Sequence, residues 1–132
     1  MNQKLRNVLA VLVAVAAGNI VITLFEGIVT MQYPYPEGMN KEDMYQMKTF
    51  VASLPASAFL LVMLGHITGS FVAGLLAWVV SKQSYVPSLI AGGLFTVFGL
   101  MVLLMLDHPW WMWIELLLYM PAAYLGARLL RK

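Results

Sequence analysis

Three ionisable side chains stand inside stretches of this sequence that are otherwise apolar: Glu26, His66 and Glu115. An ionisable group inside a membrane-length apolar segment costs at least ~2.5 kcal/mol on insertion scales, so it is a candidate for binding or proton transfer. Two carboxylates at similar depth can share a proton, because like charges at close range resist joint ionisation. Together the three side chains indicate a site that binds a cation or passes protons.

Polar side chains accompany these groups at helical spacing. Asn19 and Thr23 lie on the same helical stripe as Glu26, and Tyr119 lies on the same stripe as Glu115. Such faces turn inward when helices form a bundle. The candidates for a ligand- or proton-binding pocket are Glu26, His66, Glu115, Asn19, Thr23, Thr96 and Tyr119.

A purely structural interpretation of these residues stays open. Both glutamates are near enough to the outer surface to reach water, where a carboxylate needs no function. His66 and Asn19 can hydrogen-bond to neighbouring helices and simply join them. The residue types therefore allow either a ligand site or an interhelical contact.

A divalent metal ion is a further hypothesis for this region, with Glu26, His66, His108 and Glu115 as ligands. The paired Glu-x-x-His pattern of carboxylate di-metal bundles is absent, which speaks against it. The chain has no cysteine, so disulfides and thiolate chemistry are excluded. No catalytic motif is present, and we expect no cofactor. A membrane enzyme stays open as an alternative, but it would need a cofactor or a lipid substrate in the outer pocket, for which the sequence gives no signal.

The composition points to a membrane protein. The chain is 61% hydrophobic and 11% charged, whereas a soluble domain carries roughly 25% charged residues. A soluble protein of this length cannot hide so much apolar surface from water, but a bilayer is itself an apolar solvent. The net charge of +2 gives no indication of a nucleic-acid partner.

Four apolar runs are long enough to cross a bilayer: 7–30, 55–80, 86–106 and 109–129. They predict an all-α fold, a four-transmembrane-helix bundle that forms one membrane domain over 1–132. The loop 31–54 holds a short interfacial helix capped by Asp43, which lies flat on the lipid or acts as a lid or docking element.

Basic residues set the expected orientation. Six of the eight fall on one side of the four predicted spans, which makes that side cytoplasmic. Both termini are then cytoplasmic, and the loop 31–54 faces outward. Because the polar side chains lie in the outer half of the spans, we expect a pocket open to the outside. The six residues are Lys4, Arg6, Lys82, Arg128, Arg131 and Lys132.

Small residues recur every four positions in the second predicted span. Gly65, Gly69, Ala73 and Ala77 form one ridge, and small residues at this spacing let helix backbones approach closely. Gly92 and Gly126 are expected to serve the same purpose in the third and fourth spans. The sequence leaves open whether the ridge packs within one chain or between two copies.

The segments YPYPEGM, ASLPASAFLLVMLGHITGSFVAG, DHPWW and YLGARL resemble small four-span bacterial integral membrane proteins of no established function. The resemblance implies the bacterial inner membrane and four spans, and it implies no activity.

Two function classes remain. The first is a non-catalytic membrane module: an accessory subunit, a scaffold or a self-associating bundle. Its partners would be lipid and either a second copy or another membrane protein. The second is a small oligomeric transporter or channel that binds a proton or cation through Glu26, Glu115 and His66.

Overall fold

The computed structural model describes residues 1–82 and 84–131. Gln83 and Lys132 lie outside these residues, so Lys132 contributes to the expected orientation through the sequence alone. The described part is all-α and contains no strand. In chain order the elements are α1 (Gln3–Gln32), α2 (Met44–Ala52), α3 (Ala56–Val80), α4 (Tyr85–Met105), the 3₁₀ helix η1 (Trp110–Leu117) and α5 (Tyr119–Leu129).

In the part of the chain that the structure describes, three helices are long and apolar enough to cross a membrane: α1, α3 and α4. Their bounds lie close to the first three predicted spans. Each is apolar around most of its circumference, as expected for helices whose outer surface meets lipid. The described chain is therefore consistent with a membrane protein.

The fourth predicted span, 109–129, is not one continuous α-helix. It is divided at Leu118 into η1 and α5, and neither part has membrane length. Pro121 supplies the physical reason. It has no N–H to donate to the Leu117 carbonyl, and its ring collides with that carbonyl in a continuous α-helix. In the first turn of α5 the missing N–H costs nothing, so the α-helix begins at Tyr119.

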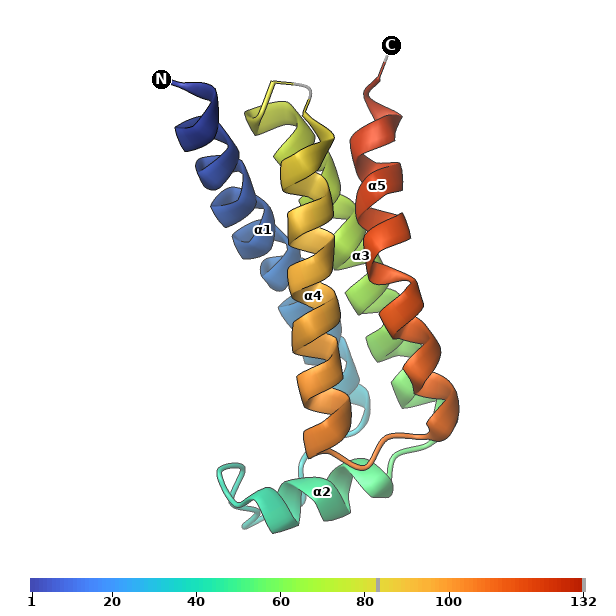
Figure 1. Ribbon diagram of the computed structural model, residues 1–132. Helices are drawn as coiled ribbons and strands as arrows, with labels where there is room; N and C mark the ends of the chain where they lie inside the picture. The colour runs from blue at the N-terminus through green and yellow to red at the C-terminus, as the bar shows by residue number, and fades with distance from the viewer. Residues whose placement is uncertain (83, 132) are drawn as a thin grey trace.

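The chain runs back and forth along one axis (Figure 1). Both termini lie at one end of the bundle, and α2 lies across the opposite end, at a steep angle to the long helices. Helix α3 packs against α1, α4 and α5, whereas α1 also reaches α4. Because α3 contacts all three of these helices, it is the central helix of the bundle.

Close approach of α3 to both α1 and α5 depends on glycine. A Cβ atom on Gly69 would lie 2.8 Å from the Gly18 carbonyl oxygen in α1. A Cβ on Gly74 would collide with the Ala123 carbonyl in α5. Gly65 similarly faces Phe25 of α1. The small-residue ridge of α3 thus packs within the chain.

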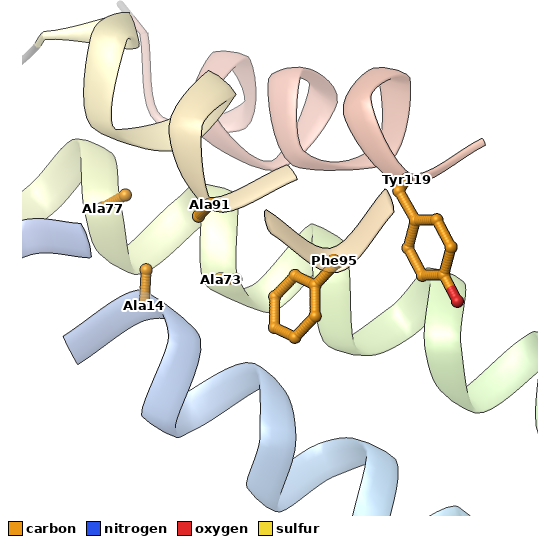
Figure 2. Close-up of a cluster of buried hydrophobic side chains, with 6 residues drawn as sticks. All are labelled: Ala14, Ala73, Ala77, Ala91, Phe95 and Tyr119. Atoms are coloured by element: carbon orange, nitrogen blue, oxygen red, sulfur yellow. The ribbon is translucent and has the colours of Figure 1, made fainter. Parts of the chain in front are cut away.

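Other small residues of the ridge lie in the buried core. Ala73 and Ala77 are fully buried together with Ala14 of α1 and Ala91 of α4. Figure 2 shows these residues with Phe95 and Tyr119, which continue the same cluster toward the middle of the bundle.

The predicted helix of the loop 31–54 is confirmed as α2. Asp43 caps it and accepts hydrogen bonds from the backbone N–H groups of Tyr45 and Gln46. Its apolar face packs on the bundle, because Val51 is buried in a cluster with Phe59, Leu103 and Met112. The helix therefore covers one end of the protein.

Candidate functional site

A cluster of three polar side chains lies between α3 and the η1–α5 segment. The His66 Nδ1 atom lies 3.1 Å from Glu115 Oε2 and 3.0 Å from the Tyr119 hydroxyl oxygen. The Tyr119 hydroxyl donates to Glu115 Oε1 at 3.3 Å. Glu115 and Tyr119 are each only 2% exposed, and the His66 side chain is 13% exposed. The fold thus brings three of the candidate residues predicted from the sequence into direct contact.

One proton arrangement satisfies all three contacts. Tyr119 has a single hydroxyl proton and gives it to Glu115, so its oxygen is an acceptor toward His66. Nδ1 of His66 then carries a proton, which it shares between the Tyr119 oxygen and Glu115 Oε2. We assign the proton from this network, since hydroxyl and imidazole protons follow their partners. The other ring nitrogen, Nε2, has no hydrogen bond within the described residues.

The change from 3₁₀ to α helix positions two members of the cluster. Residues three apart eclipse one another in a 3₁₀ helix, so Met112 and Glu115 both point into the protein and are buried. Tyr119 follows at the first residue of α5 and is held at both ends. Its carbonyl accepts a hydrogen bond of 2.7 Å from the buried Ser70 hydroxyl.

The Tyr119 ring fits because Gly99 of α4 has no side chain. A Cβ on Gly99 would lie 2.7 Å from the ring and 2.8 Å from the hydroxyl oxygen. On its other side the ring stacks near Phe95, with centroids 6.4 Å apart (Figure 2). The hydroxyl is thereby directed toward His66.

A cavity of about 380 Å³ adjoins this cluster. Helices α1 and α4 supply most of its wall, His66 comes from α3, and Tyr119 comes from α5. Glu26 and Asn19 are its other polar residues. The lining residues are Asn19, Ile22, Glu26, His66, Phe95, Phe98, Gly99, Val102 and Tyr119.

A second cavity of about 260 Å³ lies toward α2. It shares Glu26, His66 and Val102 with the first, so the two spaces meet at these side chains. Met47, Phe50, Val51 and Leu54, from α2 and the residues after it, line this second space. The second cavity therefore extends from His66 toward the end of the protein where α2 lies.

Glu26 differs from Glu115 in its surroundings. Its side chain is exposed at the wall of both cavities. Within the described part of the chain its carboxylate has no hydrogen bond, and the one ion pair is that of His66 with Glu115. The two glutamates therefore do not form the carboxylate pair that their similar depth suggested. Glu115 is paired with a histidine, and Glu26 faces open space.

The remaining polar candidates divide into two groups. Asn19 lines the first cavity, although its amide donates to the Val15 carbonyl of its own helix at 3.0 Å. Thr23 is exposed and Thr96 donates to the Gly92 carbonyl at 2.9 Å, and neither lines the two cavities. Threonine hydroxyls in helices commonly bond to the preceding turn in this way.

His108 lies apart from the polar cluster. Its Nδ1 atom is 3.2 Å from the Leu106 carbonyl oxygen, and its ring meets Phe59 edge-on with centroids 5.7 Å apart. It lines the second cavity with Glu26 and His66. Among the described residues, no three His, Asp or Glu side chains are grouped so that they could hold a metal ion.

Apolar residues complete the site. Phe95, Phe98 and Val102 occupy the α4 side of the first cavity. The sequence contains no signal for them, because a phenylalanine that lines a cavity has the same pattern as one that packs in a core. The sequence identified Ser70 only as a neighbour of Gly69, and its hydrogen bond to the Tyr119 carbonyl could not be predicted.

Comparison of the chain with protein-family models, with curated proteins and with solved structures gave no match.

Proposed function

We propose that this protein is a non-catalytic membrane module that binds a small ligand in the pocket beside His66. In this proposal the η1–α5 segment forms a fourth span, both termini are cytoplasmic, and the pocket faces the outside of a bacterial inner membrane. The protein then acts with a second copy or with another membrane protein.

One observation carries the proposal: a buried polar cluster adjoins a cavity whose wall holds an unpaired carboxylate. A bundle that serves only as a scaffold needs neither feature. An ionisable group without a partner is costly in a membrane protein and is retained where it serves a function. The cavity volume of about 380 Å³ lies within the ~300–1,000 Å³ range of small-molecule sites.

A fragment screen tests the proposal without a guess about the ligand. The purified chain is heated in detergent with neutral, cationic and anionic fragments, and the melting temperature is measured. Val102→Phe places a ring where both cavities meet and should abolish the stabilisation by fragments that bind there. Asn19→Phe fills the first cavity from α1 and serves if Val102→Phe does not fold.

Val97→Phe is the matched control, because Val97 is exposed on α4 and lines neither cavity. It should leave the response to every fragment unchanged. The proposal fails if no fragment stabilises the wild type, or if every stabilising fragment acts equally on the cavity-filled variants.

The proton shared by His66 and Glu115 favours a second candidate, a small oligomeric transporter or channel. Here Glu26, Glu115 and His66 bind a proton or cation during transport. Vesicles with the reconstituted protein should then show flux of protons or cations that Glu115→Gln removes. The absence of flux across several gradients would exclude this candidate and leave the binding module.

A further inference from the structure

The Glu26 carboxylate stands at the two cavities without a cationic partner. Glu26 and Glu115 supply two carboxylates, and among the described residues that line the cavities or contact Glu115 two groups can carry positive charge, His66 and His108. Within 1–82 and 84–131, no lysine or arginine lines either space. His66 is paired with Glu115, and the Nδ1 atom of His108 lies at the Leu106 carbonyl oxygen, with no ion pair to Glu26 in the described chain. The Glu26 carboxylate is therefore left without a partner. A cation is the natural counterpart of a carboxylate that has no partner.

The walls show what kind of cation fits. Phe95 and Phe98 of α4 and Tyr119 of α5 line the first cavity, Phe98 with 48% of its surface exposed, and Ile22 and Val102 supply aliphatic surface. Aromatic rings attract a cation through their negative faces, most strongly when the cation is poorly hydrated. Such walls favour an ammonium group that carries apolar carbon.

A divalent metal ion fits poorly. Zinc and calcium need several oxygen or nitrogen ligands. In the described ranges no three His, Asp or Glu side chains converge in this way, and the Glu115 oxygens are taken by His66 and Tyr119. One free carboxylate within an apolar wall is enough for a monovalent organic cation.

We infer that the pocket binds a monovalent organic cation with a compact apolar body, held by the Glu26 carboxylate against the rings of Phe95, Phe98 and Tyr119. This inference rests on the proposed binding function and names the class of its ligand. His66 and Tyr119 form the polar floor of the site, Glu115 holds both of them by hydrogen bonds, and Glu26 is the group that selects charge.

Calorimetric titration of the full chain in dodecyl maltoside tests this with benzyltrimethylammonium as the probe. We expect saturable binding to the wild type and about tenfold weaker binding to Glu26→Gln, a loss that corresponds to one ordinary ionic contact. Glu26→Asp keeps the charge and should retain part of the affinity. Glu42→Gln makes the same change in net charge on an exposed residue outside both cavities and should bind as the wild type does.

Two further comparisons separate charge from apolar contact. 2-Phenylethanol is a neutral probe of similar shape, and it should bind the wild type more weakly and should not distinguish Glu26→Gln. Phe98→Leu keeps an apolar wall without a ring, and it should weaken benzyltrimethylammonium about threefold while leaving 2-phenylethanol unchanged. This variant keeps the inference testable if Glu26→Gln does not fold.

The possible failures are distinguishable. The inference is overturned if Glu26→Gln binds benzyltrimethylammonium as tightly as the wild type, or if the wild type prefers 2-phenylethanol or Zn²⁺. If neutral fragments bind and Val102→Phe removes that binding, the proposed function stands without this ligand class. If neither charged nor neutral molecules bind, both proposals fall.

Discussion

The polar atoms around the cavity differ in whether they already have a partner within the protein. Glu115 accepts from Tyr119 and lies beside His66 Nδ1, so each member of this cluster satisfies the others. Glu26 has no such partner in the described chain. Helical spacing was enough to group Glu115 with Tyr119. It could not show that Glu26 would remain apart, because pairing depends on how the helices are rotated against each other.

This difference predicts opposite effects of neutralising the two glutamates. Glu115→Gln should lower the free energy of unfolding by about 1–2 kcal/mol, the size of a good interhelical hydrogen bond, because it weakens the contact with His66. Glu26→Gln should leave stability unchanged or raise it, because an unpaired group at a binding site is often unfavourable for folding. Melting in detergent measures both variants.

His66→Ala is the companion variant to Glu115→Gln. It leaves the Glu115 carboxylate buried with only Tyr119, and should destabilise the protein at least as much. A Glu115→Gln variant that melts at or above the wild-type temperature would show that this cluster does not stabilise the fold.

The helices are held together by close backbone contacts of α3 with its neighbours. Gly69 meets Gly18 of α1, and Gly74 meets Ala123 of α5. The four-residue spacing in α3 predicted the ridge to which Gly69 belongs, but it did not include Gly74. It could not identify the partners, because every span contains small residues. The break before α5 was also predictable in principle, since Pro121 lies within the expected fourth span.

The packing of α3 predicts which glycines tolerate a methyl group. Gly74→Ala should destabilise the protein by about 2 kcal/mol or more, because the new Cβ collides with the α5 backbone and the two helices must separate. Gly93→Ala is the matched control on α4, where a Cβ meets nothing within 4 Å. It should be neutral or stabilise by up to about 1 kcal/mol through helix propensity.

Thermal melting of both variants measures the difference. Equal melting temperatures for Gly74→Ala and Gly93→Ala would show that the tight contact of α3 with α5 is not formed in the folded protein.

The whole molecule has two unlike ends. One end holds the termini and the turn between α3 and α4, and the other is covered by α2 (Figure 1). Hydropathy was enough to predict the three long helices, and the capping residue Asp43 predicted α2. The side-chain cluster beneath α2 could not be predicted, because the apolar face of such a helix suits lipid as well as protein.

The two ends should lie on opposite sides of the membrane. Since the chain has no cysteine, single substitutions can be labelled without background. A membrane-impermeant maleimide should label Glu42→Cys in intact spheroplasts, whereas Lys4→Cys and Lys82→Cys should react only after permeabilisation. Labelling of all three from one side would contradict the four-span arrangement with cytoplasmic termini.

The 3₁₀ winding of η1 gives the C-terminal segment an unusual reach. At a rise of ~2.0 Å per residue, η1 extends roughly 16 Å, and α5 adds a similar length at ~1.5 Å per residue. The segment can therefore match a hydrocarbon thickness of ~30 Å without being one continuous helix. The same winding also sets the direction in which the Glu115 side chain points from the helix axis. Rewinding Trp110–Glu115 as α-helix would shorten the segment and turn Glu115 by roughly 100° about its axis, away from His66. The length of this segment and the contact between Glu115 and His66 are thus linked through the winding of η1.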